Sequence, residues 1–197
     1  MSYYPLFLDL RGQPCVVLGG GTLAAAKVRD LLLAEARITL ISAELEPDTE
    51  VAAAHPQVQI ERRPYRQGDL AGARLVVDAS GDPEVNRASW EEAEAAGILV
   101  NVVDVPDKCR FIAPAVVRRE PLLVAISTAG ESPFIASTVR ARLERVLGPE
   151  WGPFTALVGE LRRRLRAAGV PLDRQLQAYR RLLDSEALGQ LRRGEVE

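Results

Sequence analysis

The chain has 197 residues, of which 47% are hydrophobic and 26% are charged, and its formal net charge is −2. This is the composition of a globular protein rather than a disordered one, and no run of about 18 apolar residues could span a bilayer. Two cysteines, Cys15 and Cys109, cannot build a disulfide framework or a four-cysteine zinc site, and the first residues lack a secretion signal, so we expect a cytoplasmic protein.

Charge is distributed unevenly along the chain. Residues 1–107 carry nine basic and 17 acidic side chains, a net −8, whereas residues 108–197 carry 16 and ten, a net +6. A basic half can attract nucleic acid, a membrane surface or a polyanionic small molecule, although arginines on solvated helix faces give the same excess. No aromatic side chains alternate with these arginines to form a stacking surface, and we expect neither nucleic acid nor membrane as a partner.

The first half of the chain alternates apolar runs with helical patterns. The apolar runs indicate buried parallel strands at residues 15–18, 38–41, 75–79 and 98–103, with a weaker one at 58–61. The helical patterns cover residues 22–34, 47–54 and 84–96, and Gly97 caps the last of them. This alternation predicts an α/β fold, with a Rossmann-like parallel sheet over residues 1–113 whose ligands lie beyond the carboxyl ends of the strands.

The glycine turn after the first strand predicts a dinucleotide site. Gly19, Gly21 and Ala24 follow the G-x-G-x-x-A spacing between a strand and a helix. Gly19 permits the tight turn, Gly21 lets a pyrophosphate approach the backbone, and the small Ala24 lets helix and strand pack closely. The helix then points its positive end at the anion, although an ordinary strand-to-helix turn can have the same spacing.

Later strand ends supply further candidates for cofactor contacts. After residues 38–41 no acid stands at the strand tip, and the nearest one, Glu44, comes late. No arginine stands there to meet a 2′-phosphate, which favours NAD over NADP as the cofactor. Ser80 lies among the small residues that follow the run at 75–79, and Asn101 lies at the end of the run at 98–103.

Asp104 follows that last buried strand, at the edge of the sheet where nicotinamide chemistry would occur. A carboxylate held there could accept a proton while hydride leaves for the cofactor. An Asx turn before Pro106 explains an aspartate at this position equally well. Lys108 and Arg110 could neutralise substrate carboxylates, or could be solvated loop charges.

The pattern changes beyond Phe111. Short apolar runs at 115–117 and 122–126 predict a hairpin, because four polar or turn-forming residues separate them. Ser132, followed by Pro133, then predicts the capped start of a helix. That helix start could hold an anionic group of the substrate, or Ser132 could serve as a plain cap.

The remaining residues carry amphipathic helical patterns, and we expect a helical domain over residues 148–197. A two-stranded extension with few helices cannot easily bury its own apolar surface. We therefore expect residues 114–147 to form a dimerisation region that pairs with a second copy. The single histidine, His55, offers too few ligands for a metal site and no Ser–His–Asp triad, so hydride transfer is the natural chemistry.

Several segments together resemble one known family. They are Tyr4–Phe7 with Leu10, Val17–Gly21 with Ala24 and Lys27, Asn101–Pro106, Phe111–Pro114, and Ala125–Pro133. In their order and spacing they resemble the precorrin-2 dehydrogenase family, the N-terminal module of siroheme synthases, over essentially the whole chain. The resemblance implies NAD-dependent oxidation of precorrin-2 to sirohydrochlorin in siroheme biosynthesis by a homodimer, and in some members insertion of iron. The alternative is a non-catalytic dimer that senses NAD.

The resemblance also implies roles for individual residues. Cofactor contacts fall on Thr22, Leu23, Ala43 and Glu44, and the family's catalytic aspartate falls on Asp104. Precorrin-2 carries eight carboxylates, which gives a reason for the basic second half. The expected substrate-binding residues are Lys108, Arg110, Arg118, Arg119, Thr128 and Ser132. This chain departs from the fused enzyme at Thr128, where that enzyme has a serine, and in the more charged segment 107–110, which bears on metal insertion more than on dehydrogenation.

Overall fold

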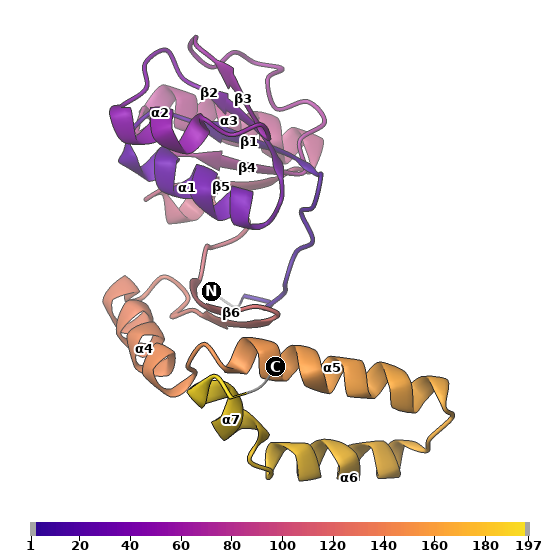
Figure 1. The fold of residues 1–197 in the computed structure, drawn as a ribbon. Coiled ribbons are helices and arrows are strands. Elements are labelled where there is room, and N and C mark those ends of the chain that lie inside the picture. Colours follow the sequence, from indigo (N-terminus) through magenta and orange to yellow (C-terminus); the bar gives the residue numbers. More distant parts are fainter. Residues whose placement is uncertain (1–2, 196–197) are drawn as a thin grey trace. The chain divides into compact units, whose positions relative to one another are not determined.

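The computed structural model describes residues 3–195. These residues divide between positions 112 and 113 into two compact units (Figure 1). Within residues 3–195, no helix is long and apolar enough to cross a membrane.

The first unit contains a five-stranded parallel sheet in the order β3-β2-β1-β4-β5. Its strands are β1 (Pro14–Leu18), β2 (Arg37–Ile41), β3 (Val58–Glu61), β4 (Leu75–Asp78) and β5 (Leu99–Val102). The chain moves outward from β1 to β3 and then returns to place β4 on the other side of β1. This reversal creates a switch point at the carboxyl ends of β1 and β4, where doubly wound sheets bind their ligands. The predicted Rossmann-like α/β fold is confirmed.

Helices cover both faces of this sheet (Figure 1). They are α1 (Thr22–Leu33), α2 (Pro47–Ala53) and α3 (Pro83–Ala96). Neighbouring strand residues alternate between the two faces, so that Val17 packs in the core beneath α1 and α2, whereas Val16 packs in the core beneath α3. The central strands β1 and β4 are buried on both faces, and their sequences are accordingly near-continuous apolar runs, whereas the edge strand β3 includes the exposed Gln59. Gly97 ends α3 in the left-handed conformation, with φ at +67°, as predicted.

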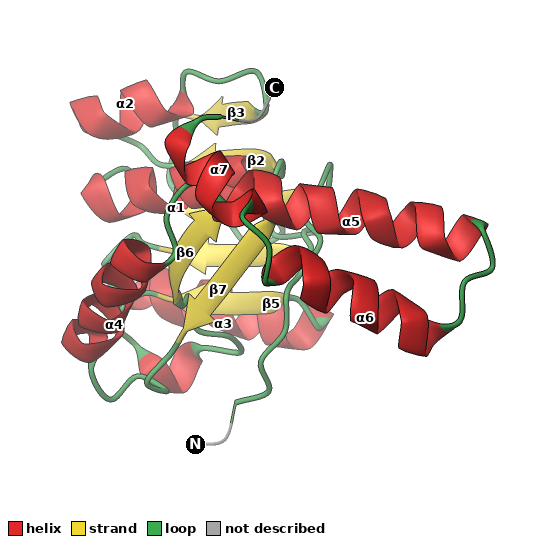
Figure 2. Cartoon of the chain, turned by 60° about the horizontal axis from the view of Figure 1, so that its bottom comes forward, coloured by secondary structure: helices red, strands yellow, loops and turns green. Residues whose placement is uncertain are grey.

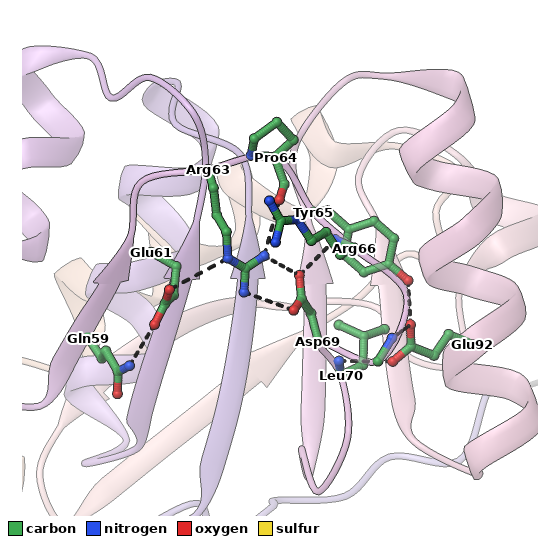
Figure 3. A network of polar contacts seen from close by, with 10 residues as sticks. Gln59, Glu61, Arg63, Pro64, Tyr65, Arg66, Asp69, Leu70 and Glu92 are labelled. Carbon is green, nitrogen blue, oxygen red and sulfur yellow. Dashed lines mark hydrogen bonds and ion pairs between the residues drawn. The ribbon is translucent and has the colours of Figure 1, made fainter.

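An irregular connection, residues 62–74, joins β3 to β4 in place of a helix. Its Leu70 is fully buried in the core beneath α3. The Glu92 carboxylate of α3 accepts hydrogen bonds from the Tyr65 hydroxyl, from Gly68 N (2.9 Å) and from Leu70 N (2.9 Å) (Figure 3). Burial, and then this hydrogen bond to Glu92, raise the pKa of the Tyr65 phenol. One carboxylate thus fastens the connection to α3.

The second unit combines a hairpin with helices. Strands β6 (Ala115–Arg119) and β7 (Leu122–Ile126) pair antiparallel, as the sequence predicts. The helices are α4 (Pro133–Val146), α5 (Trp151–Ala167), α6 (Leu172–Leu183) and α7 (Ala187–Arg193). Helices α5 and α6 lie side by side as a helical hairpin (Figure 2). The short α7 is not predicted by the sequence pattern.

Candidate cofactor and catalytic site

The glycine turn between β1 and α1 is closely packed on two sides. Gly19 has a φ of +108°, and a Cβ atom there would collide with the Ala79 carbonyl and lie 2.9 Å from Ser80 N. A Cβ atom on Gly20 would collide with the Glu44 carbonyl and lie 2.7 Å from the Ser42 Oγ. The turn therefore requires glycine at position 20 as well as at position 19, which the motif spacing did not indicate.

Gly21 is the residue that leaves space for a ligand. A Cβ atom on it would meet nothing closer than the Glu46 Oε1 at 3.5 Å, an ordinary van der Waals distance. It is the N-cap of α1 and supplies no side-chain cap. The backbone N–H groups of Thr22, Leu23 and Ala24 consequently have no hydrogen-bond partner within residues 3–195. Thr22 and Leu23 are exposed, so these donors stand at an open helix N-terminus that suits a pyrophosphate.

Hydrogen bonds to the backbone carbonyls of this turn hold the segment after β2 in place. Glu46 N donates to the Gly20 carbonyl (2.9 Å), and the fully buried Thr49 hydroxyl donates to the Gly21 carbonyl (2.9 Å). Ala43 and Glu44, both implied as cofactor contacts, are exposed beside the turn. The glycine turn and the segment after β2 therefore form one structural unit.

Ser80 takes part in an internal network at the end of β4. The buried Asp78 carboxylate accepts from Ser80 N (3.0 Å), from the Ser80 hydroxyl (2.6 Å) and from the Ser89 hydroxyl (2.7 Å). This network fixes the backbone against which Gly19 packs. A cofactor contact through the Ser80 side chain stays a prediction, while its hydroxyl already serves to shape the turn.

Asn101 fastens the segment that follows β5. Its amide donates to the Phe111 carbonyl (2.9 Å) and to the Cys109 Sγ (3.3 Å), and the Cys109 thiol donates to the Val102 carbonyl (3.2 Å). Burial raises the pKa of the Cys109 thiol and that of the Cys15 thiol, the latter to about 11. Both cysteines are therefore neutral, structural thiols near neutral pH.

Asp104 stands at the tip of this fastened segment. It is exposed and occupies the third position of a β-turn in which Val105 N donates to the Val102 carbonyl (3.1 Å). Its φ of +62° is a left-handed conformation that aspartate and asparagine tolerate better than most residues. The carboxylate makes no hydrogen bond to any residue in 3–195, and Pro106 lacks the N–H that an Asx turn would use. Within residues 3–195 the Asp104 carboxylate is thus unpaired, and it lies at the carboxyl edge of the sheet.

The cations expected to bind substrate fall into two groups. Lys108 and Arg118 have no acidic partner among residues 3–195. The Arg110 guanidinium pairs with Glu94 of α3, and this pair lowers the pKa of the Glu94 carboxyl. Arg119 donates to the carbonyls of Leu147 (2.7 Å), Glu144 (3.2 Å) and Arg118 (2.8 Å), so it caps the end of α4.

Two hydroxyl residues shape the loop before α4. The Thr128 Oγ1 accepts from Ser132 N (3.0 Å), and the Ser132 Oγ accepts from Ile135 N (3.3 Å) as the N-cap of the helix. Ser132 therefore serves as the helix cap, one of the two roles considered for it. Contacts of either hydroxyl with substrate stay a prediction. His55 is exposed, and residues 3–195 hold no cluster of three metal-ligating side chains.

Comparisons with known proteins identify the family. A family described as putative NAD(P)-binding matches residues 6–115, which is more than half of the chain. The chain belongs to this family. The membership confirms the expected dinucleotide cofactor, and the open helix N-terminus and the glycine cradle described above fit its pyrophosphate.

Sequence relatives and a solved structure extend this result. The siroheme synthase of Methylobacillus flagellatus is 41% identical over 162 residues, covering 82% of this chain and 35% of the relative. Siroheme synthase 1 of Aeromonas salmonicida is 38% identical over 196 residues, covering 99% of this chain and 42% of the relative. The chain thus spans well under half the length of these relatives, and the predicted resemblance to siroheme synthases is confirmed.

A structure titled "SirC, precorrin-2 dehydrogenase" superposes with a TM-score of 0.76 at 24% identity, covering 97% of this chain and 96% of that one. At this identity the likeness establishes a shared fold.

Proposed function

We propose that this protein is an NAD-dependent dehydrogenase that oxidises precorrin-2 to sirohydrochlorin. The observation that carries the proposal is the free Asp104 carboxylate at the carboxyl edge of a sheet whose glycine turn offers unpaired N–H groups. Supporting it, nearly the whole chain matches siroheme synthases, and its fold matches a precorrin-2 dehydrogenase.

The proposed reaction removes two hydrogens from the macrocycle, one as hydride and one as a proton. Bound NAD supplies the hydride acceptor. Thr22 and Leu23 offer their backbone N–H groups to the pyrophosphate, and Asp104 accepts the proton that leaves the tetrapyrrole. Lys108 and Arg118, whose charges are free within residues 3–195, meet carboxylates of the substrate.

We also propose that the working protein is a homodimer in which residues 114–147 form the dimerisation region and residues 148–197 a helical domain. Support comes from apolar side chains in the second unit that lie open to solvent, such as Phe134 (75% exposed) and Val146 (67% exposed). Burial of such a surface against a second copy is the usual reason for self-association. A monomer in sedimentation of the intact chain at tens of micromolar would contradict this proposal.

Anaerobic incubation of the intact protein with precorrin-2 and NAD, followed by NADH absorbance, tests the activity. The wild type should produce one NADH for each sirohydrochlorin formed. Asp104→Asn should lower kcat by on the order of 10²–10⁴, because it removes the proton acceptor while keeping a residue that tolerates the left-handed turn.

Asp107→Asn is the matched control, since Asp107 is an exposed acid three residues further along the same segment. It should retain the wild-type rate. No NADH formation by the wild type would overturn the enzymatic proposal and favour a module that only senses NAD. An undiminished rate in Asp104→Asn would remove that residue from the mechanism.

A further inference from the structure

Asp78, the last residue of β4, is a buried acid in an otherwise apolar strand. It is 1% exposed and forms no ion pair with any residue in 3–195. Burying a carboxylate costs free energy unless hydrogen bonds replace the water that it loses. Strand packing gives no reason for that cost, because Val76 and Val77 fill the same strand with apolar side chains. The reason for an acid here should therefore lie in its hydrogen-bond partners.

The two oxygens of this carboxylate bond to different parts of the first unit. Oδ2 accepts from the Ser89 hydroxyl (2.7 Å) and thereby joins β4 to α3. Oδ1 accepts from Ser80 N (3.0 Å) and from the Ser80 hydroxyl (2.6 Å), in the segment that leaves the strand. This segment contacts the glycine turn, because a Cβ atom on Gly19 would collide with the Ala79 carbonyl and lie 2.9 Å from Ser80 N. The Oδ1 bonds thus hold the backbone against which the glycine turn packs.

The backbone of Asp78 also holds the segment that carries Asp104. Strands β4 and β5 pair with Asp78 opposite Val102, and the Asp78 carbonyl accepts a hydrogen bond from Val103 N (2.8 Å). Val103 directly precedes Asp104. Asp78 is therefore bonded both to the segment beneath the glycine turn and to the segment that carries the acid. A shift of its backbone would change the separation between these two parts of the site.

We propose that Asp78 is a positioning residue of the dehydrogenase, which holds the cofactor turn and the Asp104 segment at the separation that hydride and proton transfer need. The inference rests on the proposed function. Burial keeps the carboxylate itself from substrate and cofactor, so it acts through the backbones of Ser80 and Val103. Such positioning justifies a buried acid, because a misplacement of about 1 Å can lower a reaction rate about 10²-fold.

Calorimetric titration of the intact protein with NAD, without any tetrapyrrole, tests the role toward the cofactor turn. Asp78→Ala should raise the Kd for NAD about tenfold or more, because Ser80 N loses its acceptor and the backbone beneath Gly19 can shift. Asp78→Asn should restore most of the affinity, because an amide oxygen can still accept from Ser80 and the amide NH₂ can donate to the Ser89 hydroxyl. Calorimetry also gives the number of sites per chain, which falls when part of the protein is unfolded, whereas a displaced turn changes the Kd.

Ser89→Ala is the matched control, because it removes the hydrogen bond on the α3 side of the same carboxylate and leaves the Ser80 side intact. It should lower the thermal stability, while the Kd for NAD stays within about twofold of the wild-type value. An equal rise of the Kd in Ser89→Ala and Asp78→Ala would show that the network only stabilises the fold, and would overturn the inference. An unchanged Kd in Asp78→Ala would overturn it as well. If Asp78→Ala does not fold, Asp78→Val combined with Ser89→Ala carries the same prediction, because it removes the carboxylate together with the hydroxyl that would be left unpaired.

Turnover of precorrin-2 at saturating NAD tests the role toward Asp104. Asp78→Ala should lower kcat, counted per NAD site, by on the order of 10–10²-fold, and Asp78→Asn should recover most of the rate. The KM for precorrin-2 should stay within about twofold, because the network does not include Lys108 or Arg118. A wild-type kcat in Asp78→Ala would overturn the role toward Asp104. A wild type that binds NAD but forms no NADH with precorrin-2 would contradict the proposed reaction, and the NAD titrations would still decide the role of Asp78 toward the turn.

Discussion

The two units of the molecule bury their apolar surface to very different extents. In the first unit both faces of the sheet are covered, and Val17, Leu40 and Val100 are completely buried. In the second unit, as far as residues 113–195 are described, the buried hydrophobic side chains are those of Val117, Ala136 and Phe154. The first unit therefore has the core of an independent domain, whereas the second depends on few buried groups and exposes the surface that we assign to self-association.

The largest effect should follow from truncating a buried aromatic side chain in the small core of the second unit. Phe154 is 4% exposed and packs edge-to-face with Trp151, their ring centroids 6.1 Å apart. Phe154→Ala should lower the free energy of unfolding of this unit by about 3–5 kcal/mol, because it leaves a cavity. Chemical denaturation followed by circular dichroism should then show the second unit unfolding first, with NAD binding by the first unit preserved.

Leu157→Ala on the same helix is the control, since Leu157 is 43% exposed and should cost less than about 1 kcal/mol. Loss of NAD binding together with the second unit in Phe154→Ala would contradict the independence of the first unit.

A smaller effect should follow from crowding the glycine turn of the first unit. Gly20→Ala should destabilise that unit by about 1–3 kcal/mol and abolish NAD binding, because the new methyl group collides with the Glu44 carbonyl. Gly21→Ala should leave stability nearly unchanged, because its methyl group would meet no atom closer than the Glu46 Oε1 at 3.5 Å. It should still weaken NAD binding, because the methyl group enters the space proposed for the phosphates. Equal stability losses in the two variants, measured by thermal unfolding, would contradict the assignment of a packing role to Gly20 and a ligand-binding role to Gly21.

The smallest effect concerns an ion pair in the second unit. The Glu150 carboxylate, 4% exposed, accepts from Arg192 at 2.7 Å. Its own backbone N–H, and then Arg192, lower the pKa of the Glu150 carboxyl in the folded state. The stability that this provides is present above pH 4.5, the ordinary value, and is lost as the pH falls through the lowered folded value.

Arg192→Ala should therefore lower the free energy of unfolding by about 1 kcal/mol at neutral pH. It should also make that free energy depend less on pH in the acid range. Arg193→Ala, which removes an exposed pair with Glu195, should have almost no effect. Unfolding midpoints measured between pH 3 and pH 7 compare the two variants, and a larger loss for Arg193→Ala would contradict the assignment.

Local patterns in the sequence were sufficient to predict most elements of the fold. The central strands β1 and β4 are near-continuous apolar runs, and α3 carries both its Pro83 start and its Gly97 end in the sequence. Interactions across long stretches of chain were not predictable in this way. Gly20 is required because the Glu44 backbone arrives 24 residues later, and Arg119 bonds to carbonyls 25 and 28 residues away.

The candidate site shows the same division. The G-x-G-x-x-A spacing located the cofactor turn, because the turn is made by consecutive residues. The place of the Glu46 carboxylate, 3.5 Å from where a Cβ of Gly21 would lie, could not be predicted from the sequence, because it depends on how the segment after β2 folds back onto the turn. The partners of the arginines could not be predicted either. Arg110 pairs with Glu94 of α3, and Arg119 bonds to the Leu147 carbonyl after α4, and folding is what brings these groups together.

The left-handed backbone at Asp104 limits which acids can serve at this position. A left-handed third residue in a tight turn is accessible to glycine, asparagine and aspartate, and costs most other side chains on the order of 1 kcal/mol. Replacement by glutamate would therefore strain the turn, and it would also place the carboxylate one methylene further from the backbone of the turn. The geometry of the backbone, and not only the chemistry of the substrate, keeps the shorter of the two acidic side chains here.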